Sequence, residues 1–224
     1  MNTNYNCQNE SAISVIARYM DAPASYDGGH CARVSSCAVG FAKSLRLRKS
    51  EIEALRLGGL VHDIGKMAIP DSILFKPGPL DPEEVRIVKQ HPVLGEQMCA
   101  QLKSLRHVLP MVRHHHERVN GSGYPDGLRG NAIPQTVRIL QMVDIYDALT
   151  SDRPYRSNLS MPQALSVLYD EAGRGWLDRC LVSQFASFVT GADITPASGS
   201  RRGIPVRRSI SAAANQYAVT FSRE

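Results

Sequence analysis

Apolar residues recur along most of the chain at the spacing of amphipathic helices, and no segment alternates as a half-buried strand does. The positions that share a helical face are Ile13, Ile16, Ala17 and Met20; His30, Val34, Ala38, Phe41 and Leu45; Ile52, Leu55 and Leu60; Leu94, Met98, Leu102 and Leu105; Val137, Leu140 and Asp144 after Pro134; and Leu165 and Leu168 after Pro162. The pattern predicts an all-α fold without an internal repeat.

Two helix starts carry local signals. Ser50 followed by Glu53 has the spacing of a capping box, which predicts that the third helix begins at Ser50. Asp81 precedes Pro82 and Glu84, so a proline would occupy the first helical position of the next helix.

Two segments interrupt the helical pattern. Residues 120–134 (NGSGYPDGLRGNAIP) are dense in glycine and proline, which predicts a loop. From Gly191 onward the chain has little periodicity and five arginines against Asp193 and Glu224. We therefore expect one domain at residues 1–190, with no separate N-terminal sensor domain, and a flexible basic tail at residues 191–224.

The composition narrows the class of protein. The chain has 224 residues, of which 43% are hydrophobic, but no stretch approaches the roughly 18 apolar residues of a membrane span. The polar N-terminal residues lack the apolar run of a signal peptide, so we expect a cytoplasmic protein that is not inserted in a membrane. The net charge is +5, and the tail supplies much of it, so charge does not predict DNA or RNA binding.

The cysteines do not have the pattern of a disulfide framework. Their positions are Cys7, Cys31, Cys37, Cys99 and Cys180, an odd number without CxxC spacing. This distribution predicts reduced thiols and argues against a structural zinc site.

Histidines and aspartates fall on the predicted core faces. His30 lies four residues before Val34, His62 follows the apolar run LGGLV, and Asp144 lies four residues after Leu140. A buried carboxylate needs a cation or several hydrogen-bond donors. Imidazole and carboxylate donors without a thiolate suit iron or manganese, with zinc and nickel as alternatives.

The number of candidate donors favours a catalytic site over a structural one. The candidates are His30, His62, Asp63, His91, His115, His116 and Asp144. If Asp63 bridges two ions and a hydroxide also bridges them, about two of the positions of two octahedral ions stay open for substrate oxygens.

Several motifs occur in the order of a known family. LVHDIGKMAIPDSILFKPGPLDPEE, KQHPVLGEQM, HHERVNGSGYPDGLRGNAIP and VDIYDALTSDRPYR resemble the HD-GYP family, a branch of the HD phosphohydrolases, and the resemblance runs from about His30 to Asp178. It implies a helical HD core with added helices, two divalent metal ions (iron or manganese), and hydrolysis of cyclic di-GMP or a related cyclic dinucleotide.

The resemblance also implies residue roles. The metal ligands would be His30, His62, Asp63, His91, His115, His116 and Asp144, with Asp63 as the bridging carboxylate; Lys66 would contact the scissile phosphate; and Tyr124, Asp147, Arg153 and Arg156 would lie near the substrate. The residues themselves support the role of Lys66, because it lies one helical turn after Asp63 and a cation there stabilises the charge of a phosphodiester transition state. His107 and His114 match no ligand position, so we expect surface or structural roles.

The sequence departs from the family at two positions. Many members place a metal-binding glutamate where this chain has Tyr26, and Asp27 is out of register, so we expect two metals and not three. The residue before GSGYP is Asn120 instead of an acid, but this position is not a ligand.

The predicted reaction is attack by a metal-bridging hydroxide, which gives linear pGpG and, by a second cut, GMP. One alternative is a catalytically weak adaptor that binds a cyclic dinucleotide, or a diguanylate cyclase through the 120–134 loop. Another is a hydrolase of mononucleotides, which the GYP loop disfavours. The sequence does not predict the oligomeric state.

Overall fold

The computed structural model describes residues 29–151 and 158–191. Its elements are α2 (His30–Ser44), α3 (Lys49–Val61), η1 (Ile64–Ala68), α4 (Asp71–Leu74), α5 (Pro82–Val88), α6 (His91–Ala100), η2 (Lys103–Val108), α7 (Leu109–His114), η3 (Gly130–Ala132), α8 (Gln135–Thr150), α9 (Met161–Gly173) and α10 (Arg179–Thr190). Within these ranges the only strand-like pairing is an isolated bridge between Asn120 and Arg129, which confirms the all-α prediction. The predicted helix at Ile13–Met20, the pair Arg153 and Arg156, and the predicted tail beyond Gly191 lie outside the described residues.

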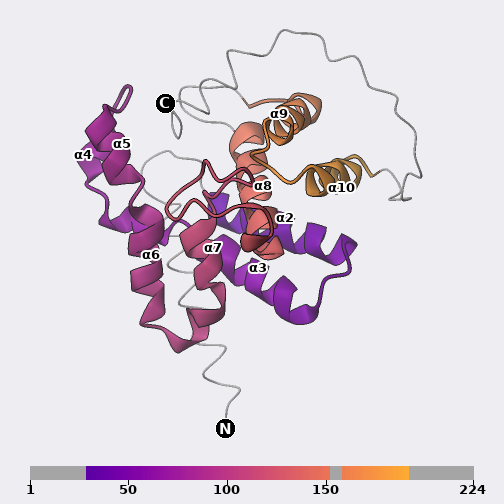
Figure 1. The fold of residues 1–224 in the computed structure, drawn as a ribbon, viewed down its shortest axis with the longest axis horizontal. Coiled ribbons are helices and arrows are strands. Elements are labelled where there is room, and N and C mark those ends of the chain that lie inside the picture. Colours follow the sequence, from indigo (N-terminus) through magenta and orange to yellow (C-terminus); the bar gives the residue numbers. More distant parts are fainter. Residues whose placement is uncertain (1–28, 152–157, 192–224) are drawn as a thin grey trace.

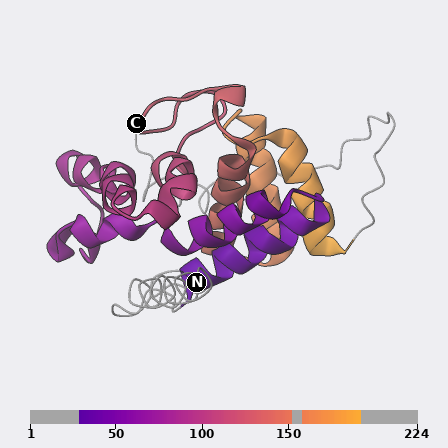
Figure 2. The same ribbon diagram turned by 90° about the horizontal axis from the view of Figure 1, so that it is seen from below.

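Helix α8 is contacted by α2, α3, α7, α9 and α10, whereas α4, α5 and α6 lie farther from it (Figure 1). The antiparallel pair α2 and α3 packs against α8, while α9 and α10 pack on another side of it. Figure 2 shows the same order from below, with α4 and α5 at one end and α9 and α10 at the other. Phe41 of α2 and Phe185 of α10 are fully buried and meet edge to face, with ring centroids 5.1 Å apart. No helix in the described ranges is long and apolar enough to cross a membrane.

The predicted helix starts have different outcomes. Asp81 caps α5 as predicted, because its carboxylate accepts the backbone N–H of Glu84 at 2.9 Å. The predicted start of α3 at Ser50 is wrong: the helix begins at Lys49, and Glu51 reaches back to the backbone N–H of Arg48 at 3.0 Å. The carboxylate of Glu53 instead pairs with Arg56 in the next turn.

One predicted helix is divided in two. Apolar residues at Leu94, Met98, Leu102 and Leu105 suggested one continuous helix, but α6 ends at Ala100 and the 3-10 turn η2 follows. Leu105 is buried in η2, whereas Leu102 is 47% exposed and Met98 is 37% exposed. The break turns the chain back so that α7 packs beside α6. The predictions for α8, after Pro134, and for α9, with Leu165 and Leu168 buried, are confirmed.

Candidate metal centre

The structure brings all seven candidate ligands together in two adjacent groups. Asp63, His91, His115 and His116 form the first group, and His30, His62 and Asp144 form the second; within each group one ligand atom per residue lies within 4.8 Å of the others. They come from α2, the α3–η1 junction, the start of α6, the end of α7 and the middle of α8. Ligands distant in the sequence therefore meet only because these helices pack together.

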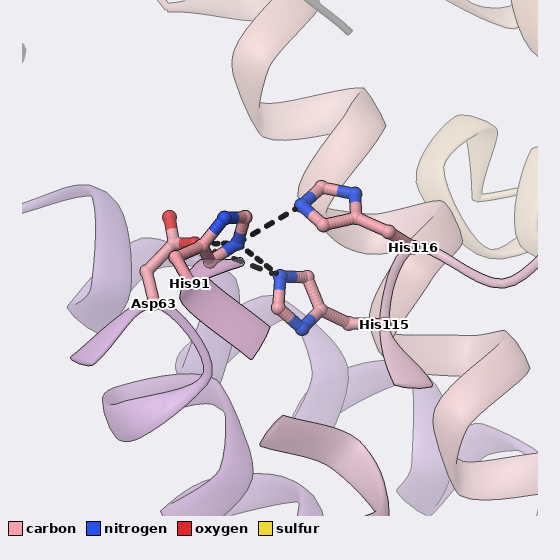
Figure 3. A group of neighbouring side chains, drawn as sticks. All are labelled: Asp63, His91, His115 and His116. Atoms are coloured by element: carbon pink, nitrogen blue, oxygen red, sulfur yellow. Dashed lines mark hydrogen bonds and ion pairs between the residues drawn. The ribbon is translucent and has the colours of Figure 1, made fainter. Parts of the chain in front are cut away.

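In the first group, ring nitrogens converge on one point (Figure 3). Nε2 of His91 lies 3.2 Å from Nε2 of His115 and 3.2 Å from Nε2 of His116. Oδ1 of Asp63 lies 3.3 Å from the same nitrogen of His91. Neighbouring ligands of an octahedral ion with bonds of about 2.1 Å are roughly 3 Å apart, so this spacing suits a common cation.

Backbone contacts determine which ring nitrogen faces the centre. In His62, His91 and His115, Nδ1 lies 2.8–3.0 Å from the carbonyl oxygen three residues earlier. A carbonyl oxygen only accepts, so Nδ1 carries the hydrogen and Nε2 of the neutral ring presents a lone pair. The lone pairs on His91 and His115 then face each other, an arrangement that a shared metal ion stabilises.

Asp63 lies between the two groups. Its Oδ1 faces His91, and its Oδ2 lies 3.5 Å from Nε2 of His62. In the second group, Oδ1 of Asp144 lies 3.2 Å from Nε2 of His30. Oδ1 of Asp63 and Nε2 of His62 are buried and have no hydrogen-bond partner among the described residues. Two unsatisfied buried atoms with free lone pairs fit metal ligation, with Asp63 placed to bridge.

A salt-bridge network holds the Nδ1 side of the His30 ring. Oδ2 of Asp147 accepts from Nδ1 of His30 at 2.8 Å, and Arg33 donates to both carboxylate oxygens at 2.8 and 2.9 Å. Burial alone would lower the pKa of His30, but Asp144 and Asp147 outweigh it and raise the pKa to about 10. The carboxylate of Asp147 contacts His30 and Arg33, and its expected place near the substrate stays a prediction. Sequence reasoning missed Arg33, although it lies one turn after His30 just as Asp147 lies one turn after Asp144.

Lys66 adjoins the bridging position. Its Nζ lies 2.5 Å from Oδ2 of Asp63, and its side chain is 30% exposed. Burial would lower the pKa of Lys66, but the carboxylate of Asp63 raises it above its ordinary value. The ammonium group thus stays charged beside Asp63.

The 120–134 loop lies against the first ligand group. The ring of Tyr124 stacks on that of His116, with centroids 4.8 Å apart and an interplanar angle of 22°. The Nζ of Lys89 lies 5.4 Å from the centre of the Tyr124 ring. The structure therefore places Tyr124 beside a candidate metal ligand.

Glu117 holds this loop, and sequence reasoning missed it. The side chain is fully buried, and its carboxylate accepts the backbone N–H groups of Asp126 at 2.7 Å and Leu128 at 2.9 Å. The loop passes so close to the preceding turn that a Cβ on Gly123 would come within 2.3 Å of the backbone nitrogen of Arg118. The sequence signal that could have identified Glu117 is its position directly after the paired histidines.

The remaining histidines behave as expected. His114 pairs with Asp126 at 2.8 Å, and the same carboxylate accepts from Arg113 at 2.7 Å, so His114 fastens the loop and stays outside the ligand groups. His107 is exposed. The described cysteines, Cys31, Cys37, Cys99 and Cys180, are free thiols.

The chain is similar to one protein family and to several curated phosphodiesterases. A family model described as an HD domain matches residues 12–181. The cyclic di-GMP phosphodiesterase response regulator RpfG of Xanthomonas campestris pv. campestris is 41% identical over 177 residues, covering 77% of this chain and 47% of that protein. The 3'3'-cGAMP-specific phosphodiesterase 3 of Vibrio cholerae is 35% identical over 159 residues, covering 71% of this chain and 35% of that protein. The chain thus spans less than half the length of these two relatives.

Solved structures agree on the fold. An HDG"Y"P protein of Bdellovibrio bacteriovorus, Bd1817, superposes with a TM-score of 0.60 at 22% identity, covering 84% of this chain and 60% of that chain. A cyclic GMP-AMP-specific phosphodiesterase of Vibrio cholerae superposes with a TM-score of 0.57 at 18% identity, covering 83% of this chain and 50% of that chain. At these identities the likeness shows the fold alone.

Proposed function

Because this chain belongs to the HD domain family, and its motifs are those of the HD-GYP branch, we propose that it is a metal-dependent phosphodiesterase of cyclic dinucleotides. The observation that carries the proposal is the pair of adjacent ligand groups with Asp63 between them. The named activities of RpfG and of the Vibrio cholerae relative support a cyclic dinucleotide as the substrate class.

The donor set supports two divalent ions, iron or manganese. His30, His62 and Asp144 would hold one ion, His91, His115 and His116 the other, and Asp63 both. When bound, divalent cations in such a site polarise a phosphoryl oxygen and lower the pKa of a coordinated water to near neutrality. Nitrogen and carboxylate donors without thiolate match iron and manganese.

The chain's own residues complete the chemistry. Lys66 offers a charged ammonium 2.5 Å from Asp63, where it can stabilise the negative charge that gathers on the non-bridging phosphate oxygens. Asp147 acts as a positioning residue, because its carboxylate accepts from Nδ1 of His30 and so directs Nε2 of that ring toward Asp144. Arg33 in turn holds the carboxylate of Asp147. Tyr124, stacked on His116, lines the same site.

We further propose that the first cut yields linear pGpG and that this product accumulates early. A second cut to GMP requires rebinding of a product that carries an additional charged phosphate end. The test is to incubate protein purified without oxygen with cyclic di-GMP, 3'3'-cGAMP or cyclic di-AMP and to separate the products by chromatography. We expect a linear dinucleotide from at least one substrate. Tight binding without turnover, by protein that holds its metals, would favour the adaptor alternative.

A further inference from the structure

The side chain of Tyr124 runs alongside that of His116. The backbone N–H of Tyr124 donates to the carbonyl oxygen of His116 at 3.3 Å, and the two rings stack with centroids 4.8 Å apart. The two side chains therefore start from bonded backbone groups and lie beside each other. Nε2 of His116 lies 3.2 Å from Nε2 of His91 (Figure 3), so the phenol ring of Tyr124 is directed toward the same ligand group.

The loop holds the ring in this direction. Gly123 packs on the segment that carries His116, because a Cβ there would come within 2.5 Å of the His116 carbonyl oxygen. The buried carboxylate of Glu117 accepts backbone N–H groups on the other side of Tyr124, from Asp126 and Leu128. The position of the Tyr124 hydroxyl is therefore set by the backbone and the ring, and not by a hydrogen bond of its own.

The Tyr124 hydroxyl is buried and has no hydrogen-bond partner in the part of the chain that the structure describes. Two atoms of the metal centre, Nε2 of His62 and Oδ1 of Asp63, are buried and unpaired in the same way. Those two atoms present lone pairs, which metal ions would satisfy. A hydroxyl that donates needs an acceptor instead, so a different group must satisfy Tyr124.

The charges around Tyr124 place its hydroxyl near both ligand groups. Burial raises the pKa of Tyr124 well above its ordinary value, and the carboxylates of Asp63 and Asp144 raise it further, against the opposing charge of Arg118. Asp63 belongs to the first ligand group and Asp144 to the second. The hydroxyl thus keeps its proton and remains a donor beside the centre.

An oxygen of the substrate phosphate is the acceptor that suits this donor. In a two-ion site, phosphate oxygens take the open positions of the ions. A neutral hydroxyl binds an anionic oxygen by a strong hydrogen bond without placing another charge beside the cations. The ammonium of Lys66, 2.5 Å from Oδ2 of Asp63, supplies a charged donor in the same centre.

We propose that the hydroxyl of Tyr124 donates a hydrogen bond to a non-bridging oxygen of the phosphate that is cleaved. The inference rests on the function proposed above and adds a neutral phosphate contact to the charged one of Lys66. The stacked ring of His116 and the loop backbone hold the donor in place before the substrate binds.

The test is Tyr124→Phe, which keeps the ring on His116 and removes only the hydroxyl. Calorimetric titration of Mn²⁺-loaded protein with inorganic phosphate should show an affinity roughly 10- to 100-fold lower, the effect of losing one hydrogen bond to a charged acceptor. Tyr169→Phe is the matched control, because Tyr169 lies on α9 and is 44% exposed, and it should bind phosphate as the unaltered protein does. Equal phosphate affinity in Tyr124→Phe and the unaltered protein would overturn the contact.

Two measurements on metal-free protein separate this contact from a structural role. Tyr124→Phe should melt no lower than the unaltered protein, because its hydroxyl has no partner to lose among the described residues. It should also bind Mn²⁺ with unaltered affinity, because the ring that stacks on His116 remains. A lower melting temperature or weaker Mn²⁺ binding would make Tyr124 a support of the loop or of His116 and would overturn the phosphate contact.

Hydrolysis distinguishes this inference from the proposed function. With a cyclic dinucleotide that the unaltered protein cleaves, Tyr124→Phe should lower kcat/KM by at least the factor found for phosphate binding. Hydroxyl-dependent phosphate binding by a protein that cleaves no cyclic dinucleotide would contradict the proposed activity and support the contact. Unchanged kcat/KM in Tyr124→Phe would overturn the contact and leave the proposed activity intact.

Discussion

Replacing Asp147 by asparagine tests whether this carboxylate positions His30 for metal binding. The side chain is buried, with 8% of the residue exposed, and it accepts from His30 at 2.8 Å and from Arg33 at 2.8 and 2.9 Å. Asp147→Asn keeps the shape but removes the charge that orients His30. Loss of such a partner costs about 10- to 100-fold in metal affinity, or about 1.4–2.7 kcal/mol.

The effect on folding should be smaller than the effect on metal binding. The side chain of Arg33 is 38% exposed, so its guanidinium can turn toward water when the carboxylate is lost. Partly exposed ion pairs contribute about 1 kcal/mol or less to the free energy of unfolding. The variant should therefore remain folded at room temperature while it binds the ions more weakly.

The assay is a titration of metal-free protein with Mn²⁺, followed by the electron paramagnetic resonance of the free ion. Asp126→Asn is the matched control, because Asp126 also pairs with an arginine and a histidine, but His114 is not in either ligand group. We expect weakened binding in Asp147→Asn only. Equal Mn²⁺ affinity in Asp147→Asn and the unaltered protein would refute the positioning role.

Three other changes have defined outcomes. Lys66→Ala should lower turnover by about 10²–10³, the size of one lost oxyanion donor, with metal content unchanged by elemental analysis; loss of metal would make Lys66 structural instead. Gly123→Ala should displace the loop, because its Cβ would meet the backbone of Arg118 at 2.3 Å, and so lower both thermal stability and activity; a wild-type melting curve would contradict this. A chain ending at Thr190, the last residue of α10, should fold and hydrolyse substrate as the full chain does, and a large drop in melting temperature would show that the tail packs on the core.

Helix periodicity was enough to predict the all-α fold, and residue type together with the family resemblance selected seven candidate ligands that the structure brings together. Their role as metal ligands stays a prediction. Helical positions such as His30 and Asp144 lie on apolar faces, and only a few side chains can ligate a metal, so pattern and chemistry pointed to the same residues. The same reasoning failed for Leu102, which has helical spacing but lies beyond the end of α6 and is substantially exposed, because periodicity does not show where a helix ends.

Contacts between segments distant in the chain could not be predicted from the sequence. The pairing of Arg33 with Asp147 depends on how α2 packs on α8, and that of Arg118 with Trp176 depends on where the loop meets the α9–α10 turn. Glu117 looked like one more residue beside the paired histidines, but its carboxylate binds backbone N–H groups nine and eleven residues later. Such partners are set by tertiary packing and not by a local pattern.

The most direct test of the central claim is metal content measured together with hydrolysis in the unaltered protein and in Asp63→Ala. Asp63 lies between the two ligand groups, so the account predicts two ions per chain and turnover of a cyclic dinucleotide in the unaltered protein. In Asp63→Ala it predicts loss of metal and of nearly all activity while the helical circular dichroism persists. Near-normal turnover by Asp63→Ala, or three tightly bound ions in the unaltered protein, would contradict the account.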